Sequence, residues 1–238
     1  MANKALTGSV LTVAQGIYEE NSAAQHNLGD TVFTNDGRAF RYCQAGATAL
    51  ISGNLQQAKV ENTADQNLAV AAASVGATQI VTTSTVTVDA NEYTNGFVVV
   101  SVTPSIGKVF SIKAHAAASA AALTINLYDP LEIALTTDTR IDLVANLYSK
   151  VLINPPTATG VPVGVAVGSL RASYYGWLGV AGLQPVLADG AITPGSQLCA
   201  SNGTAGAVET ATGTQAVVGI SYGGIATTET GLVKLQLL

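Results

Sequence analysis

The chain has 238 residues, of which 48% are hydrophobic but only 11% are charged, whereas ordinary soluble domains carry roughly 25% charged residues. Its high hydrophobicity excludes a disordered chain, and its net charge of −5, with ten scattered basic residues, argues against a nucleic-acid partner. A surface of small neutral side chains costs little to desolvate, so this composition suits close-packed assemblies as well as secreted β proteins.

The N-terminal region carries few strand patterns and contains polar clusters such as EENSAAQHN. This composition predicts an extended N-terminal arm over residues 1–35, of the kind that orders on a partner. The opening MANKALTGSVLTVAQGIYEE lacks a continuous apolar core followed by a cleavage site, so we expect no signal peptide and synthesis in a cytoplasm. No run approaches the roughly 18 apolar residues of a membrane span, which predicts no membrane partner.

The stretch DGRAFRYCQAG follows the predicted arm and combines arginines, aromatic residues and a cysteine. Its first two residues predict a turn, after which alternation along a strand places Phe40 and Tyr42 on one face. Arg38 shares that face near the turn, while Arg41 and Cys43 share the other. We expect Arg38 and Arg41 to fix the junction of arm and fold to a carboxylate of a neighbouring subunit.

Helix signals are scarce. Thr63–Ala77, TADQNLAVAAASVGA, is the best helix candidate because Thr63 or Asp65 can cap its start and Gly76 can end it. The alanine tract Ala114–Leu123 is ambiguous, since its propensity is helical while the strand patterns on both sides leave room for a loop or a short turn.

Strand signals dominate the rest of the chain. Alternating or β-branched runs bounded by Gly, Asn, Asp and Pro recur from QIVTTSTVTVDA to LVKLQL, and Asn95-Gly96 marks a tight turn between two of them. The fold class that these patterns predict is mainly β, with antiparallel β-sandwich or β-tulip-like barrel modules, the extended arm, and at most one or two short helices.

Composition also suggests where the domains divide. INPPTATGVPVG, at 153–164, concentrates three prolines and two glycines, as a linker or a rigid loop does. We therefore expect a β-sandwich-like domain over residues 36–155 and a small β-barrel module over residues 156–238, closed by the last strand.

Residue patterns for metal or cofactor chemistry are weak. Cys43 and Cys199 have no neighbouring cysteine, which excludes a C-x-x-C redox or zinc pattern and predicts two buried free thiols. His26 and His115 lack a second ligand at metal-binding spacing, so we expect no metal and no cofactor. The acidic residues of YDPLEIALTTDTRID are interpreted as solvated turns; they are Asp129, Glu132, Asp138 and Asp142.

GISYG, at 219–223, matches the G-x-S-x-G pattern of hydrolase nucleophiles, which would make Ser221 catalytic. That pattern requires a strand, a turn and a helix, followed later in the chain by an acid and a histidine. No histidine follows His115, and a turn and a strand follow Gly223. We therefore interpret GISYG as a glycine-flanked turn and expect no enzyme activity.

SYYGWLG, at 173–179, holds the single tryptophan of the chain shortly after two tyrosines. Tyr174, Tyr175 and Trp177 are interpreted as core anchors or as interface residues, the two usual places for such rings. The alternative is an exposed sugar platform built from the same three residues.

The order of several motifs resembles the capsid decoration, or cement, proteins of tailed bacteriophages. The motifs run from DGRAFRYCQAG through NLAVAAASVGAT, NEYTNGFVVV, FSIKAHAA and DPLEIALTTDTRIDLVAN to YYGWLGVAGLQPVLADGAITPGSQL, so the likeness extends from about Gly29 to the end. The resemblance implies β-tulip or sandwich modules on the capsid exterior of a virion made in a bacterial host. It also implies a homo-oligomer, commonly a trimer and otherwise a dimer, that clamps subunits of the major capsid protein, with no catalytic residues.

Two functions of different kinds follow. The first is a structural virion protein that binds the outer surface of an icosahedral head and stabilises contacts between major capsid subunits. The alternative is a carbohydrate-binding β module of a virion fibre or spike, which would use Tyr174, Tyr175 and Trp177.

Overall fold

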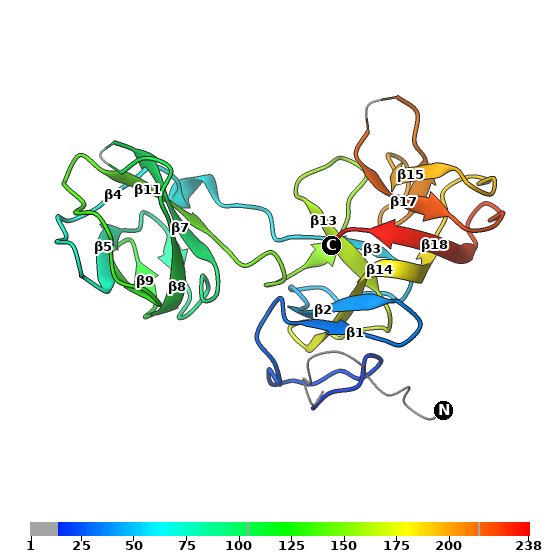
Figure 1. Cartoon of the computed structure of the whole chain (residues 1–238), viewed down its shortest axis with the longest axis horizontal. Helices are drawn as coiled ribbons and strands as arrows, with labels where there is room; N and C mark the ends of the chain where they lie inside the picture. Colours follow the sequence, from blue (N-terminus) through cyan, green and yellow to red (C-terminus); the bar gives the residue numbers. More distant parts are fainter. Residues whose placement is uncertain (1–13, 104, 214) are drawn as a thin grey trace. The chain divides into compact units, whose positions relative to one another are not determined.

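The computed structural model describes residues 14–103, 105–213 and 215–238, and the chain forms two compact units built from strands (Figure 1). Unit 1 comprises Met1–Val60 and Leu147–Leu238, and unit 2 comprises Glu61–Asn146, so unit 2 is an insertion in the sequence of unit 1. Within the described ranges the only helical segment is one 3-10 turn, η1 (Thr63–Asp65). The predicted mainly β, antiparallel fold class is confirmed.

This division differs from the expected domains over residues 36–155 and 156–238. The strands on either side of that boundary, β12 (Leu152–Ile153) and β13 (Pro162–Ala166), both pair with β3 (Leu55–Gln57) in unit 1. The proline-rich segment is therefore a loop within one sheet. Proline marks a break in backbone pairing, but such a break can separate two strands as easily as two domains.

Unit 1 contains a ten-stranded antiparallel sheet that curls into a half-barrel (Figure 1). Its other strands are β1 (Thr31–Phe33), β2 (Ala39–Gln44), β14 (Tyr175–Leu187), β15 (Gln197–Ala200), β16 (Val208–Thr210), β17 (Val217–Ser221) and β18 (Thr230–Gln236). The strand order is β12-β3-β13-β14-β18-β17-β15-β16, with β2 joined to β14 and β1 to β2. Alternate residues face inward and form the core, which includes Leu55, Val165, Val186, Ile192, Leu198, Val208, Val218, Ile225, Val233 and Leu235.

Strand β14 connects the parts of this sheet. It pairs with β2 along its first half, with β13 at Leu178 and Gly179, and with β18 along its second half. The register with β2 shifts between Gly179 and Ala181, and such an irregularity bends a strand. Gly182 adopts a φ of +78°, a conformation that residues with a Cβ rarely take. The bend therefore depends on glycine.

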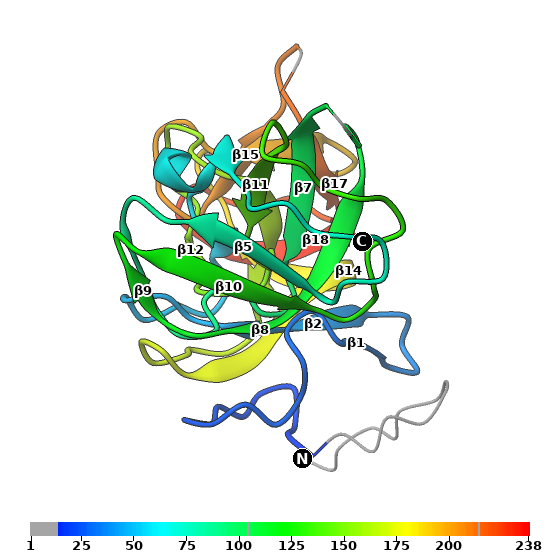
Figure 2. The same cartoon turned by 90° about the vertical axis from the view of Figure 1, so that its left-hand side faces the viewer.

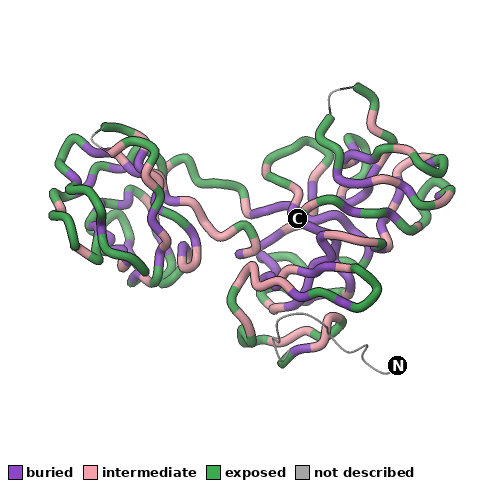
Figure 3. Tube along the Cα trace, in the orientation of Figure 1, coloured by how far each residue is buried: buried purple, intermediate pink, exposed green. Residues whose placement is uncertain are grey.

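The β2–β14 pair has a separate core on each face. Phe40 and Tyr42 pack with Trp177 on one face, whereas Cys43 packs with Leu178 on the other. The predicted alternation of Phe40 and Tyr42 against Cys43 is thereby confirmed. Figure 3 shows the same principle along the chain, because buried stretches follow the strands while many connecting loops are exposed.

Unit 2 is a nearly closed six-stranded barrel (Figure 2). The strand order is β4 (Leu68–Ala69), β11 (Arg140–Val144), β7 (Phe97–Val102), β8 (Val109–His115), β10 (Ala122–Leu127) and β5 (Gln79–Thr83). The remaining gap, between β4 and β5, is bridged just beyond β4, where the Ala71 amide donates to the Val81 carbonyl at 2.8 Å and Val70 forms an isolated bridge with Thr82. Its core includes Ile80, Val98, Val100, Ile112, Leu123, Ile125, Leu127, Ile141 and Leu143.

The helix predicted over Thr63–Ala77 is wrong. The Asn62 side chain caps the single turn η1 by accepting from the Ala64 amide, and the backbone is extended again at Gln66. Leu68 and Val70 are buried on either side of exposed Ala69, so barrel packing overrides the helical propensity of the alanines.

The alanine tract Ala114–Leu123 forms the end of β8, the start of β10 and a short strand β9 (Ala118–Ser119) that pairs with β6 (Thr87–Val88). The structure resolves this ambiguous tract against a helix, and the short strand β9 forms where the sequence left room for a loop or a turn. In the described part of the chain, no helix is long and apolar enough to cross a membrane.

Replacement of Gly182 by alanine tests the bend. A Cβ at Gly182 would lie 2.7 Å from the Gly37 carbonyl oxygen. The substituted residue would also have to adopt a positive φ. We expect Gly182→Ala to lower the free energy of unfolding by about 2–5 kcal/mol. Gly190→Ala is the matched control, because Gly190 has a φ of +88° with nothing within 4 Å of its Cβ position, and we expect a loss of only about 1–2 kcal/mol. Equal losses in chemical denaturation would contradict the steric role of Gly182.

Candidate functional site

The described part of the predicted N-terminal arm lies against the sheet of unit 1. Gln15 is 2% exposed, and its side-chain amide donates to the backbone carbonyls of Glu19 at 2.7 Å and Tyr175 at 2.9 Å. Asn21 and Tyr175 exchange two backbone hydrogen bonds of 3.0 and 2.8 Å. We call residues 15–30 the clasp. The beginning of the predicted arm, residues 1–13, lies outside the described residues.

The clasp covers an aromatic cluster. Trp177 is 3% exposed, and its indole N–H donates to the Gln15 carbonyl at 3.2 Å. The Tyr42 hydroxyl donates to the Gln15 side-chain oxygen at 2.8 Å and accepts from the Gln25 amide at 3.0 Å. Its ring lies edge-on to Trp177 at 4.9 Å and stacks with Tyr175 at 6.2 Å. Burial raises the pKa of Tyr42, which keeps its hydroxyl protonated as a donor.

This geometry corrects the proposed sugar platform. A platform needs an exposed ring face, but both Trp177 and its N–H group are enclosed by the clasp. Trp177 is therefore a core anchor, as the first interpretation of SYYGWLG allows. The sequence could not indicate this burial, because the covering segment lies about 150 residues earlier in the chain.

The two tyrosines that precede Trp177 lie near the middle of the clasp, at Glu20 and Asn21. Tyr174 is half-buried under the guanidinium group of Arg171, 4.1 Å from the ring centroid. Arg171 Nε pairs with Glu20 Oε1 at 2.5 Å, and the Arg171 amide donates to Glu20 Oε2 at 2.7 Å. The hydrogen bond from that amide lowers the pKa of Glu20. Tyr175 contributes the backbone groups that pair with Asn21.

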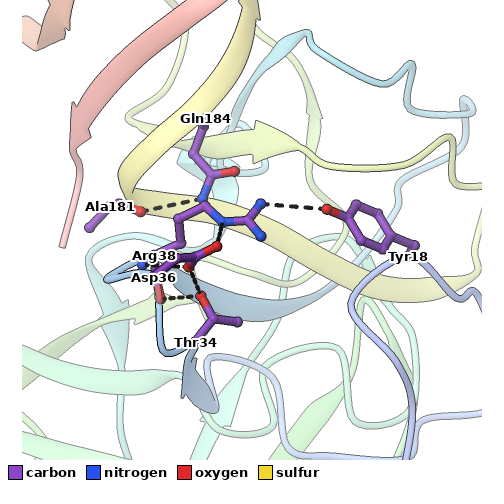
Figure 4. Close-up of polar contacts among 6 residues, drawn as sticks. All are labelled: Tyr18, Thr34, Asp36, Arg38, Ala181 and Gln184. Carbon is purple, nitrogen blue, oxygen red and sulfur yellow. Dashed lines mark hydrogen bonds and ion pairs between the residues drawn. The ribbon is translucent and has the colours of Figure 1, made fainter. Parts of the chain in front are cut away.

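Arg38 lies at the β1–β2 turn in a polar group shown in Figure 4. Its Nε pairs with Asp36 Oδ2 at 3.0 Å, its Nη1 donates to the Tyr18 hydroxyl at 3.4 Å, and its guanidinium carbon lies 5.3 Å from the Phe40 ring centroid. Asp36 also accepts from the Thr34 hydroxyl. This last hydrogen bond, followed by the Arg38 amide and charge, lowers the pKa of Asp36 to about 2.

Arg41 is also held by its own chain. Its Nη1 donates to the Gly29 carbonyl at 2.6 Å, and its guanidinium carbon lies 5.7 Å from the Tyr148 ring centroid. The two arginines predicted to bind a neighbouring carboxylate thus already have partners, Arg38 a carboxylate and Arg41 a carbonyl. The contacts of Arg38 with Tyr18 and of Arg41 with Gly29 connect the clasp to the sheet, whereas Asp36 lies within the β1–β2 turn. A role of the two arginines between subunits stays a prediction.

Both cysteines are buried and free, which confirms that part of the sequence analysis. Burial raises the pKa of the Cys43 thiol and that of the Cys199 thiol. Neither position favours the thiolate that nucleophilic chemistry needs.

Ser221 ends β17 and is 3% exposed. Its hydroxyl donates to the Gly223 carbonyl at 2.5 Å, and the segment continues through a turn into β18, whereas a hydrolase nucleophile would precede a helix. His115 is buried in unit 2, where Nε2 accepts from the Tyr93 amide at 3.0 Å and Nδ1 donates to the Ala116 carbonyl at 2.9 Å. His26 lies against the aromatic cluster, 5.1 Å from the Tyr42 ring.

The acidic residues interpreted as turns are mostly exposed. Asp129, Glu132 and Asp138 are exposed, while half-buried Asp142 accepts from the Asn67 amide at 2.7 Å. Within the described ranges, no three side chains of the metal-binding types gather closely enough to hold an ion.

An apolar surface on unit 1 is a feature that the sequence analysis missed. Leu183 and Pro185 on β14 pair with Lys234 and Leu232 on β18, and Lys234 pairs in turn with Ile220 on β17. Exposed fractions reach 38% for Leu183 and 46% for Leu232. We call this surface the lysine face; it consists of Leu183, Pro185, Leu187, Ile220, Tyr222, Leu232 and Lys234.

Comparison of the chain with protein-family models, with curated proteins and with solved structures finds no match.

The clasp can be tested through Trp177, the single tryptophan. Gln15→Ala removes the hydrogen bonds of the Gln15 side chain to Glu19, Tyr42 and Tyr175. We expect a red-shifted tryptophan emission, easier quenching by acrylamide, and a loss of about 1–3 kcal/mol in the free energy of unfolding. Gln25→Ala is the control, because the Gln25 side chain bonds only the exposed Ala23 carbonyl. Unchanged emission in Gln15→Ala would show that the clasp does not enclose Trp177.

The pKa of Asp36 predicts a pH dependence. Because the folded pKa of about 2 lies below the usual value near 3.9, the Asp36 contacts stabilise the turn above about pH 4 and are lost as the pH falls toward 2. We expect the Asp36 carboxyl signal in a carbon NMR titration to have its midpoint near pH 2. Thr34→Val removes the hydroxyl donor and should raise that midpoint. A midpoint near 3.9 in the unaltered chain would refute this.

Proposed function

We propose that the chain is a structural protein of a tailed-phage virion, which binds the outer surface of an icosahedral head and stabilises contacts between major capsid subunits. The observation that carries the proposal is the apolar character of outward strand faces in both units. Leu183 and Leu232 are exposed on unit 1, and Phe97 and Val109 are 42% and 54% exposed on unit 2. Exposed strand faces are ordinarily polar, and contiguous apolar faces are typical of interaction surfaces.

The polar groups that suggested chemistry support the same proposal. Arg38, Trp177 and Ser221 all use their polar atoms for contacts within the chain. The resemblance of the motifs to decoration proteins agrees with a role in binding. We therefore propose the major capsid protein as partner and a homo-oligomer, with a trimer favoured, at the capsid exterior, and no enzyme activity, nucleic-acid partner or membrane partner.

Such a protein would act by mass action. A protein that binds the expanded head more tightly than the unexpanded head stabilises the expanded state by its difference in affinity for the two. An oligomer that makes several modest contacts gains from effective concentration, so each contact can be weak while the whole binds tightly. Apolar surfaces with little charge suit this role, because their desolvation costs little.

The test is binding to heads purified from the phage whose genome encodes the chain. We expect the protein to co-sediment with expanded heads at saturating stoichiometry, to bind unexpanded heads at least tenfold more weakly, and to raise the melting temperature of expanded heads. Expanded heads that keep the same melting temperature and do not co-sediment the protein would refute the proposal.

A further inference from the structure

The lysine face has one charge in an apolar setting. Lys234 is exposed, and the strand positions beside it carry Leu183 and Ile220. No ion pair or hydrogen bond engages the Lys234 ammonium group within the described ranges. The next row of the sheet holds Pro185 and Leu232, and the Tyr222 amide donates to the Leu232 carbonyl, which places a 70% exposed tyrosine beside that row. A partner for this face needs an apolar surface with a carboxylate.

A surface of that kind occurs on unit 2. The loop Tyr128–Ile133, which we call the acidic knob, exposes Tyr128 by 53% and Ile133 by 39%. Asp129 lies between exposed Tyr128 and Pro130 and has no ion-pair partner within the described ranges, whereas Glu132 pairs with Lys108 at 3.0 Å.

The acidic knob is held firmly in place by its own barrel. Leu131 is 1% exposed, its amide donates to the Ala77 carbonyl at 2.8 Å, and its carbonyl accepts from Gly76 at 2.8 Å. The Tyr128 hydroxyl donates to the Asn95 side chain at 2.9 Å. The knob therefore presents its exposed side chains without a large cost in conformational entropy.

The net charges of the two units also favour a contact between Lys234 on unit 1 and the acidic knob on unit 2 of another copy. Unit 2 contains eight acidic and three basic residues, whereas unit 1 contains seven of each, so unit 2 carries the whole net charge of −5. A cation on a neutral unit is thus complementary to the acidic unit of another copy.

We propose that the lysine face of one copy docks on the acidic knob of a second copy, with Lys234 against Asp129. The contact is heterologous, since two lysine faces packed on each other would bring two ammonium groups into one desolvated interface. Heterologous contacts build rings when the rotation closes. The inference concerns copies of this chain alone and does not depend on a role in a virion.

Charge reversal tests the contact in the purified full-length chain. We expect the wild-type chain to associate in sedimentation velocity as its concentration rises. Lys234→Glu and Asp129→Lys should each weaken association about tenfold or more, because each places like charges together. An equimolar mixture of the two variants should recover association, since Lys234 of one meets Asp129 of the other and the reversed pair also matches. The double variant should recover it as well.

Apolar substitutions provide a second, independent readout. Leu232→Asp should weaken association, whereas Val161→Asp, at a residue that is 59% exposed and outside both surfaces, should leave it unchanged. Thermal melting of each variant checks that the fold is intact. A wild-type chain that stays monomeric at every concentration would overturn the proposal and leave the lysine face to another partner. Single variants that associate normally, or a mixture that does not recover, would overturn it too.

Discussion

The backbone pairing of β14 is the constraint on which unit 1 depends. One strand hydrogen-bonds to β2, β13 and β18, so it must turn from one part of the sheet into another without leaving its ladder. Gly179 and Gly182 make this possible, because a Cβ at Gly179 would lie 2.5 Å from the Gln184 side chain and Gly182 adopts a positive φ. The aromatic cluster and the lysine face lie on either side of this bend, the first toward β2 and the second toward β18.

The bend separates two kinds of surface. On the β2 side the chain covers its own aromatic residues with the clasp, and Gln15 satisfies the polar atoms of Tyr42 and Trp177. On the β18 side nothing in the described chain engages Lys234, and the neighbouring leucines remain exposed. The arginine and tryptophan side chains that suggest binding in the sequence thus make contacts within the chain. Leucine and other apolar side chains and one lysine form the exposed lysine face instead. This contrast favours recognition by shape and apolar contact over recognition by a reactive group.

Local patterns predicted local structure well. Alternation placed Phe40 and Tyr42 opposite Cys43, and Asn95-Gly96 marked a turn in which Asn95 has a φ of +60°. Long-range packing decided the rest. Alanine-rich Thr63–Ala77 has helical propensity, but burial of alternate residues in a barrel outweighs it. The lysine face could not be predicted, because its three strands meet only through the sheet order and each contributes no more than three residues of ordinary type.

The position at which the sequence of unit 2 is inserted into unit 1 determines how freely the inserted segment can be replaced. Gln57, shortly before the insertion, pairs with Leu152, shortly after it, so the sheet itself holds the two ends of the inserted sequence side by side. The entropy of closing a loop grows only slowly with its length, and no strand of the host sheet is interrupted. A shorter loop or a different domain can therefore replace unit 2 at this junction, while the half-barrel keeps its hydrogen bonds.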